Sequence, residues 1–348
     1  MLWTPLNDLF GIDLPIFGAP MGGVAGPELV AAVSEAGGLG ILGHANLEPD
    51  EVWRQIRLTK SRTDKPFGIG LLFPSRTEET KHDEARRPLP AFLEKFLDID
   101  DLAEVPAHSY SHDLSGQRLA IAIEQGVRLL ALGLGAPASV VARAKAAGMK
   151  VIALVGSRRA ALEAELAGVD AVVAQGHEAG GHTGRTSTMV LVPQIVDAVR
   201  VPVIAAGGIA DGRGLAAALV LGASGALIGT RLLATPEART AETHKRRLVE
   251  MQEDETVVSR CYTGKPSRVI RNEFVDSWKG REAEILPMPG QWERVAPVVM
   301  PAKRRGSLEI GNWPTGQCAV LVRNVTPAGE VIRQMADDAT RLLSDHCR

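Results

Sequence analysis

The sequence is poor in cysteine and has no long apolar run. Its three cysteines, Cys261, Cys318 and Cys347, are scattered and lack the spacing of a metal site or a redox motif. This pattern argues against a disulfide framework and is typical of a reducing compartment, so we expect a cytoplasmic protein. No apolar stretch reaches membrane-spanning length without a glycine, a proline or a charge, and the first residues lack the pattern of a signal peptide. We therefore expect no membrane association.

Positive charge is not in excess either. The 348 residues include 39 lysines and arginines against 41 acidic residues, which gives a formal net charge of −2. Because proteins that bind nucleic acids usually carry a surplus of basic residues on one face, we expect no nucleic-acid partner. Aromatic residues make up only 4% of the chain, whereas 45% is hydrophobic, so aliphatic side chains must dominate the core.

What the sequence does contain is a regular alternation of short apolar runs with alanine-rich helical patterns. Eight such runs are bounded by glycine or proline, which is typical of parallel strands buried on both faces. Most of them start roughly 20 to 30 residues apart, the length of one strand, one helix and two short loops. The pattern predicts an α/β fold, a (β/α)8 TIM barrel. An open doubly wound sheet is disfavoured because no G-x-G-x-x-G follows the first strand. The predicted strands are Pro15–Ala19, Leu39–Gly43, Phe67–Leu72, Leu129–Leu132, Lys150–Val155, Ala171–Gln175, Val203–Ala206 and Ala226–Gly229.

Two intervals break this rhythm. The first, Pro74–His112, is charged and punctuated by proline, and we interpret it as loop with a short helix. The second, Thr235–Asn312, follows the eighth strand and contains a helical stretch around Glu242–Glu253 and a proline-rich segment. Because barrel enzymes place their active sites at the C-terminal ends of the strands, we expect the second interval to form an inserted cap subdomain there. The predicted division is a barrel of residues 1–234, a substrate-capping insertion of residues 235–312 and a closing segment of residues 313–348 with a helix over Ala328–Leu343.

Glycines follow directly after the seventh and eighth strands. Gly207 and Gly208 end the seventh strand, and Gly229 and Thr230 end the eighth. Glycine lets an anion approach backbone N–H groups because no Cβ stands in the way, and the loops after these two strands are the usual phosphate site of such barrels. We therefore predict a phosphate-binding site here. The alternative is that both segments are only tight turns.

A similar turn ends the first strand. It reads Ala19-Pro20-Met21-Gly22, an apolar strand running into proline, methionine and glycine. Such a turn can press its backbone against the flat ring of a cofactor. Many barrel strands end in a glycine-rich turn, however, so a purely structural role stays open.

The loop after the sixth strand collects titratable side chains among glycines. It contains His177, Glu178 and His182, and Gly180 and Gly181 stand just before the second histidine. An unperturbed histidine titrates near neutral pH, which suits it to move a proton. Because its small neighbours give it little local packing, His182 is the predicted catalytic residue, whereas His177 is more often structural and Glu178 is expected to anchor the loop. We predict no metal site, because the two glycines disfavour a helical His-x-x-x-His face.

At these residues the chain resembles the nitronate monooxygenase family, formerly called 2-nitropropane dioxygenases, and its relatives, the flavin-dependent enoyl-acyl-carrier-protein reductases. The resemblance extends from about residue 15 to about residue 340 and is more specific for the superfamily than for the reaction. The matching motifs are Ala19-Pro20-Met21, Gln175-Gly176-x-Glu178-Ala179-Gly180-Gly181-His182, Pro202–Asp211 and Gly229-Thr230-Arg231, together with Ala36-Gly37-Gly38-Leu39-Gly40 and Gly316-Gln317.

The resemblance implies FMN as the cofactor, no metal, and His182 as the catalytic histidine. One departure concerns Gly70, at the end of the third strand, where members of the family often have asparagine, so a side-chain contact to the flavin is expected to be missing. Together with the glycine turns, the residues expected to bind the cofactor are Ala19, Pro20, Met21, Gly22, Gly70, Gln175, Gly180, Gly181, Gly207, Gly208, Leu227, Ile228, Gly229 and Thr230.

Three functions follow from the resemblance. The leading hypothesis is oxidation of alkyl nitronates or nitroalkanes by FMN and O2 to carbonyl compounds and nitrite, with a small molecule and O2 as partners and a homodimer left open. The second is an NAD(P)H-dependent flavin enoyl-thioester reductase acting on acyl-carrier-protein or CoA thioesters, which the run Thr186–Met189 matches equally well. The third is a non-catalytic FMN-binding protein, in which His182 would be inert.

Overall fold

The chain folds as a closed parallel barrel. The computed structural model describes residues 2–43, 47–73, 88–97 and 112–346. Eight strands form one sheet in the order β1-β9-β8-β6-β5-β4-β3-β2, and a parallel bridge between Phe17 and Leu39 joins its two edges. The predicted (β/α)8 TIM barrel is therefore confirmed, with every predicted strand at its expected place. The strands are β1 (Ile16–Gly18), β2 (Ile41–Gly43), β3 (Gly68–Leu72), β4 (Leu129–Gly133), β5 (Lys150–Val155), β6 (Ala171–Gln175), β8 (Val203–Ala206) and β9 (Gly225–Ile228).

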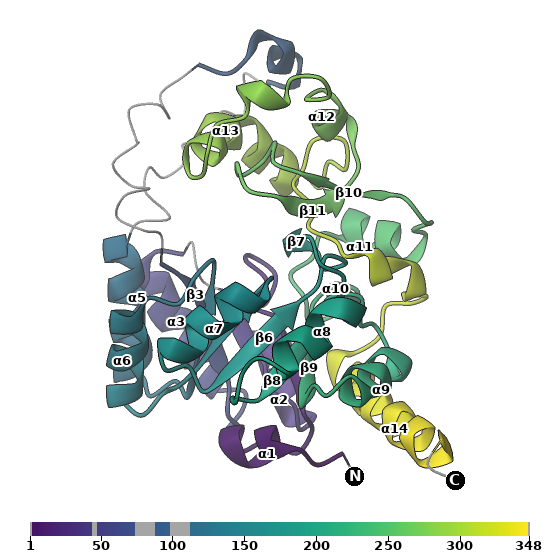
Figure 1. The fold of residues 1–348 in the computed structure, drawn as a ribbon. Helices are drawn as coiled ribbons and strands as arrows, with labels where there is room; N and C mark the ends of the chain where they lie inside the picture. Colours follow the sequence, from purple (N-terminus) through teal and green to yellow (C-terminus); the bar gives the residue numbers. More distant parts are fainter. Residues whose placement is uncertain (1, 44–46, 74–87, 98–111, 347–348) are drawn as a thin grey trace.

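Helices surround the barrel, and the last one closes it (Figure 1). The final helix packs against the helices that follow β1 and β8. A Cβ on Gly212 would lie only 2.4 Å from the Cβ of Asp338, so glycine there permits the close approach of the closing helix. The helices around the barrel are α2 (Pro27–Glu35), α3 (Pro49–Lys60), α5 (His112–Glu124), α6 (Ala138–Ala146), α7 (Arg158–Leu166), α8 (Thr188–Val196), α9 (Gly212–Val220), α10 (Thr230–Leu233) and α14 (Ala328–His346).

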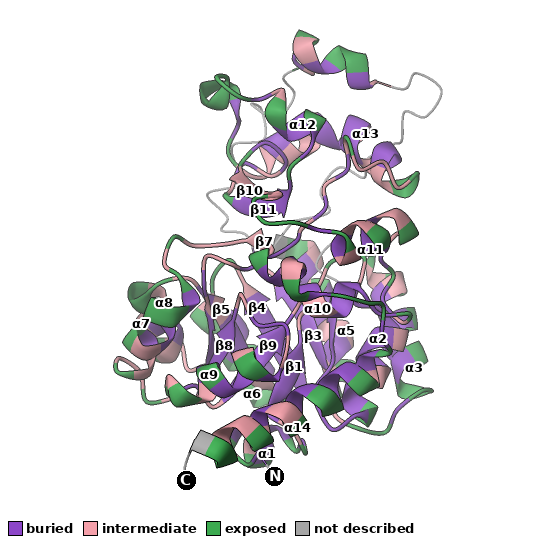
Figure 2. Ribbon diagram, turned by 90° about the vertical axis from the view of Figure 1, so that its right-hand side faces the viewer, coloured by how far each residue is buried: buried purple, intermediate pink, exposed green. Residues whose placement is uncertain are grey.

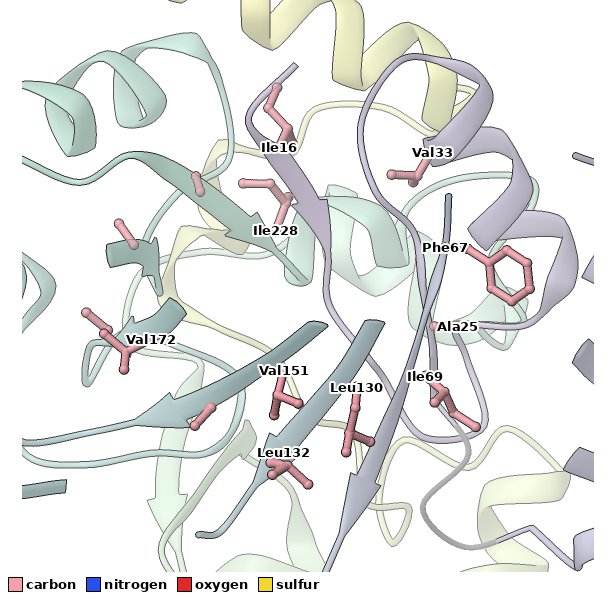
Figure 3. Packing of buried hydrophobic residues seen from close by; sticks show 14 of the residues in the cluster. Ile16, Ala25, Val33, Phe67, Ile69, Leu130, Leu132, Val151, Val172 and Ile228 are labelled. Carbon is pink, nitrogen blue, oxygen red and sulfur yellow. The ribbon is translucent and has the colours of Figure 1, made fainter. Parts of the chain in front are cut away.

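Side chains of the strands alternate between two apolar layers, as the pleat of a strand requires. Phe17 and Leu227 point into the barrel, whose bottom is filled by α1 (Pro5–Phe10). Val151 and Ile228 point the other way, into the layer between strands and helices (Figure 3). Figure 2 shows the strands buried and the outer faces of the helices exposed. Since each buried aliphatic side chain contributes about 1.5–3 kcal/mol, the two layers supply most of the barrel's stability.

Residues 235–312, called the insertion below, lie beyond the C-terminal ends of the strands (Figure 1). The proline-rich segment forms a helix in spite of Pro297 and Pro301. The sequence did not predict this helix, because proline lacks the N–H that a helix interior uses. The elements of the insertion are α11 (Glu242–Val249), β10 (Thr256–Ser259), β11 (Ser267–Ile270), α12 (Glu273–Asp276), η4 (Glu282–Glu284) and α13 (Gly290–Arg304).

The insertion and the first irregular interval form one apolar core, separate from the two layers of the barrel. The described part of that interval forms η2 (Ala91–Phe96), and Phe96 lies in one buried cluster with Phe274 and Trp278. The rings of Phe92 and Trp278 meet edge to face, with centroids 5.2 Å apart. The two intervals that break the barrel rhythm therefore meet in space. Residues 74–87 and 98–111 of the first interval lie outside the described residues, and the domain boundaries at 234 and 312 stay a prediction.

The described ranges lack the features of a membrane-spanning helix and of a metal site. None of the helices in these ranges is both long and apolar enough to cross a membrane. The same ranges contain no group of three or more histidine, cysteine, aspartate or glutamate side chains that could hold a metal ion. Burial raises the pKa of the Cys261 and Cys318 thiols to about 12, so both stay protonated at neutral pH, while Cys347 lies outside the described residues.

Candidate active site

The two glycine turns predicted to bind a phosphate lie next to each other. Ala206, the last residue of β8, pairs with Leu227 of β9, so the chain leaves both strands at the same end of the barrel. Gly207 and Gly208 have φ angles of +92° and +77°, in the left-handed region that favours glycine. The sequence needs glycine at both positions for the backbone to turn as it does.

These turns present unused backbone donors. Among the residues that the structure describes, the N–H groups of Gly207, Gly208 and Gly229 donate to no other residue. A Cβ on Gly229 would lie 3.6 Å from the nearest atom, so the approach to this turn is not crowded. Neighbouring N–H groups without acceptors attract an anion. The turns therefore fit a phosphate group.

A buried network holds the first of these turns in place. The carboxylate of Glu178 accepts hydrogen bonds from the backbone N–H of Thr188, at 2.9 and 3.1 Å, at the start of α8. The hydroxyl of Thr188 lies 3.0 Å from the same carboxylate and 2.9 Å from the carbonyl oxygen of Gly207. Glu178 thus anchors the loop, as predicted, and connects it to the turn after β8.

The turn after the first strand lies against the same end of the barrel. The N–H of Ala19 donates to the carbonyl of Ile228 at 2.9 Å, and the sulfur of Met21 would lie 3.8 Å from a Cβ on Gly229. Pro20 packs on Gly70 so closely that a Cβ there would be 2.3 Å from the proline Cβ. The position where relatives often have asparagine is therefore closed by Pro20 in this protein. The remaining residue of this turn, Gly22, is exposed, with nothing within 4 Å of a Cβ.

Some residues predicted to bind the cofactor can do so only through their backbone, and the polar side chain of another is hydrogen-bonded within the protein. The side chains of Leu227 and Ile228 are buried in the two layers described above, so only their backbone can face a cofactor. The hydroxyl of Thr230 accepts a hydrogen bond from the N–H of Gly316 at 2.9 Å. A Cβ on Gly180 would lie 2.7 Å from that same nitrogen. The segment before α14, which we predicted only to close the barrel, thus packs against the site.

The backbone of His182 is held more firmly than the sequence predicted. Gly181 and His182 form a short strand, β7 (Gly181–His182), which pairs with β11 of the insertion in a sheet of order β10-β11-β7. His182 pairs with Ser267, and the side-chain amide of Gln175 donates to the carbonyl of His182. The expectation of little local packing was wrong, because the strand that pairs with His182 comes from a part of the chain far along the sequence.

The imidazole of His182 also meets the insertion. Its Nε2 lies 2.9 Å from the hydroxyl of Thr263. Burial, and next the positive charge of Lys265, lower the pKa of His182 to about 4. The ring is therefore neutral at pH 7. The sequence prediction of a pKa near neutrality was wrong, because burial and the charge of Lys265 depend on the folded structure.

The second histidine of the loop has a structural role. The Nδ1 of His177 lies 3.0 Å from the carbonyl oxygen of Gly184, and its Nε2 lies 2.9 Å from the guanidinium of Arg268 in β11. A carbonyl only accepts and a guanidinium only donates, so Nδ1 carries the proton and Nε2 accepts. Arg268 also donates to the backbone carbonyl of His177 at 3.2 Å. This pair ties the loop to the insertion.

Sequence reasoning missed the side chains that the insertion brings to this site. Thr263, Lys265 and Arg268 stand in a stretch with neither barrel rhythm nor a recognisable motif. The run Thr263-Gly264-Lys265-Pro266 does have the composition of a tight turn, and Gly264 has a φ of +81°. This local signal identifies the turn but says nothing about the histidine that it reaches.

Comparisons with known proteins identify relatives of this chain. A family model described as nitronate monooxygenase matches residues 3–338. The chain is 33% identical to a probable nitronate monooxygenase of Staphylococcus saprophyticus over 99% of both proteins. It is 38% identical to a (3aS,4S,5R,7aS)-5-hydroxy-7a-methyl-1-oxo-octahydro-1H-indene-4-carboxyl-CoA dehydrogenase of Mycobacterium tuberculosis, over 79% of this chain and 68% of the relative.

The similarity extends to solved structures. The crystal structure of a nitroalkane oxidase from Streptomyces ansochromogenes matches with a TM-score of 0.84 and 31% identity, over 98% of this chain and 99% of that one. Fold, motifs and sequence identity over the whole length agree. The chain therefore belongs to the nitronate monooxygenase family and is a flavin oxidoreductase.

Proposed function

We propose that the protein is an FMN-dependent nitronate monooxygenase, which oxidises alkyl nitronates with O2 to carbonyl compounds and nitrite. The observation that carries this proposal is the pairing of a neutral His182 with the cationic Lys265 at the end of the barrel where the glycine turns present unused N–H groups. One half of this arrangement suits a cofactor phosphate, and the other half suits a small anionic substrate.

The barrel would hold the cofactor through its backbone. The N–H groups of Gly207, Gly208 and Gly229 would bind the phosphate, and the turn at Ala19–Met21 lies beside Gly229. A bound flavin supplies the two-electron acceptor that no side chain of this chain provides. The family to which the chain belongs favours FMN over a larger flavin.

The insertion would select an anion. A nitronate is already deprotonated, so it needs positive charge more than it needs a base. The charge of Lys265 lies close enough to His182 to lower the histidine's pKa, and the same charge would stabilise a nitronate bound beside the ring. His182 adds no second charge at neutral pH. A base with a pKa of about 4 is weak for removing a proton from carbon, so nitronates should be better substrates than neutral nitroalkanes.

A second function also has support from the comparisons. The relative in Mycobacterium tuberculosis is a carboxyl-CoA dehydrogenase, so an oxidoreductase of CoA thioesters shares 38% of its residues with this chain over the aligned region. An NAD(P)H-dependent enoyl-thioester reductase is therefore the alternative. It would use the same flavin site and receive its electrons from a nicotinamide instead of from the substrate.

Anaerobic reduction of the flavin separates the two functions. The purified protein is mixed without oxygen with propane-2-nitronate, and in a second cuvette with NADH and NADPH. We expect the nitronate to bleach the flavin absorbance, and admission of air to restore the yellow colour with release of nitrite. Rapid bleaching by NADH or NADPH, with none by the nitronate, would overturn the proposal in favour of the reductase.

A further inference from the structure

The imidazole of His182 forms a hydrogen bond with a side chain of the insertion. The hydroxyl oxygen of Thr263 lies 2.9 Å from Nε2 of His182, 81 positions away in the sequence. We propose that Thr263 is a positioning residue that fixes the tautomer of His182, with the proton on Nε2 and the lone pair on Nδ1. This inference deepens the proposed function and rests on His182 acting at the substrate.

The hydrogen bonds of the Thr263 hydroxyl decide between the two tautomers. The hydroxyl has one proton and two acceptors within reach, Nε2 of His182 at 2.9 Å and the carbonyl oxygen of Lys265 at 3.3 Å. The N–H of Lys265 donates to the same hydroxyl oxygen at 3.4 Å. If the hydroxyl donates to the Lys265 carbonyl, the histidine must donate from Nε2, and all of these groups are paired. In the opposite tautomer the hydroxyl must donate to Nε2 of His182 instead, so its hydrogen bond to the Lys265 carbonyl is lost.

The turn that carries Thr263 is tightly packed against the backbone of a neighbouring segment. A Cβ on Gly264 would lie 2.5 Å from the carbonyl oxygen of Leu286 and from the nitrogen of Met288, so the turn is packed backbone to backbone. The N–H of Gly264 donates to the carbonyl of Arg260 at 2.8 Å. Because the turn cannot shift without breaking these contacts, the threonine hydroxyl has a fixed position.

The histidine is attached to the same turn through its backbone. The strand β7 pairs with β11, which begins directly after the turn, and the N–H of Thr183 donates to the carbonyl of Pro266 at 3.2 Å. Both partners of the contact between Thr263 and His182 are therefore held by one small sheet.

The tautomer has a chemical consequence. With Nε2 as the donor to Thr263, Nδ1 is the nitrogen that can accept a proton from the α-carbon of a neutral nitroalkane. The C–H bond breaks, its electron pair stays on the substrate to form the nitronate, and the proton becomes the new N–H at Nδ1. The imidazolium that results keeps its hydrogen bond to Thr263 throughout. With the other tautomer, Nδ1 would already carry a proton and could only donate.

Nitrogen NMR on protein labelled with 15N-histidine tests the tautomer without any turnover. The His182 signals are assigned by their loss in His182→Asn. We expect Nε2 of the wild-type holoenzyme to be protonated at pH 7 and Nδ1 to be unprotonated. In Thr263→Val, which keeps the shape but removes the hydroxyl, this preference should be lost, and in Thr263→Ser it should return.

Kinetics provide the second readout. We expect Thr263→Val to lower kcat for a neutral nitroalkane roughly tenfold, the effect of one hydrogen bond, with KM little changed, and Thr263→Ser to restore it. The control is Thr243→Val, because Thr243 is also in the insertion and its hydroxyl also donates to a backbone carbonyl, that of Gly306, at 2.8 Å. It should leave both the tautomer and kcat unchanged.

Two results would overturn the inference. One is a wild-type His182 that carries its proton on Nδ1, and the other is a Thr263→Val variant that keeps the wild-type tautomer. Neither result depends on the substrate, so the inference can fail while nitronate oxidation stands. Conversely, a protein that oxidises no nitro compound but shows the expected tautomer would refute the proposed function and leave the placement of Thr263 intact.

Discussion

In the proposed site, the barrel and the insertion would contribute by different means. The barrel offers backbone: the unused N–H groups belong to Gly207, Gly208 and Gly229. The insertion offers side chains, the hydroxyl of Thr263 and the charge of Lys265. Backbone donors are independent of the side chains around them, so they suit a cofactor that all members of a family share. Side chains can be exchanged one at a time, so they suit a substrate that differs between members.

The barrel and the insertion also differ in the side chains that form their cores. The barrel strands fill two layers with aliphatic side chains in strict alternation. The core of the insertion combines aliphatic side chains with a group of aromatic rings, among which those of Tyr262 and Phe274 are stacked at a centroid distance of 5.0 Å. A periodic aliphatic pattern repeats along the sequence, whereas an aromatic cluster is assembled once from distant segments.

The largest effect is expected at the histidine where the two regions meet. Because a base with a pKa of about 4 is weak, His182→Asn should lower kcat/KM for neutral nitroalkanes by roughly 10²-fold, the lower end of the usual loss for a general base, and should affect preformed nitronates much less. The measurement compares both substrate forms under steady-state conditions. Equal damage to both would assign His182 to anion binding or to the architecture of the loop, and no damage to either would remove it from the site.

The backbone half of the site should be sensitive to one added side chain. Gly208→Leu should weaken flavin binding at least tenfold, because a side chain at a φ of +77° is strained by roughly 1–3 kcal/mol and blocks access to the N–H groups. Flavin fluorescence titration of the apoprotein measures the Kd. Gly148→Leu is the control, since Gly148 has a φ of +80° but lies before β5, at the other end of the barrel. Full flavin affinity in the Gly208 variant would place the phosphate elsewhere.

The side-chain half should respond to loss of one charge. Lys265→Gln should raise KM for nitronates about tenfold, as expected for one partly screened charge pair, and should leave flavin affinity unchanged. The effect should shrink at high salt. Lys279→Gln, at an exposed position of the same insertion, provides the comparison and should change nothing. A higher Kd for the flavin in the Lys265 variant would contradict the proposal that the barrel binds the cofactor and the insertion binds the substrate.

The smallest effect concerns stability and pH. Burial, and next the charge of Lys303, lower the pKa of His244 from 6.5 to about 3. As the pH falls, His244 therefore binds a proton in the unfolded chain before it does so in the folded protein. The contribution of the neutral, buried His244 to the free energy of unfolding is complete above pH 6.5 and is lost progressively between pH 6.5 and pH 3. We expect His244→Gln to reduce the pH dependence of the free energy of unfolding by about 1 kcal/mol per pH unit between pH 6 and 5. Urea unfolding at both pH values tests this, and an unchanged slope would refute it.

The sequence predicted what depends on neighbours along the chain. Strands, glycine turns and the anchoring role of Glu178 all follow from residues within a few positions of one another. It failed where distant segments meet. The contact between His182 and Thr263 spans 81 positions, and the lowered pKa of His182 results from burial and from Lys265, which no local pattern encodes. The helix α13 was not predicted, because Pro297 and Pro301 lack the N–H that a helix interior uses.

The short strand β7 has a consequence for attempts to recombine members of this family. A chimera that exchanges residues 235–312 as a module would cut the sheet β10-β11-β7 between its second and third strands, because Gly181 and His182 belong to the recipient. The register of Arg268 on Gly181 and of Ser267 on His182 must therefore be inherited from one parent. Successful crossover points should lie before the loop that follows β6, so that histidine, turn and threonine are transplanted together.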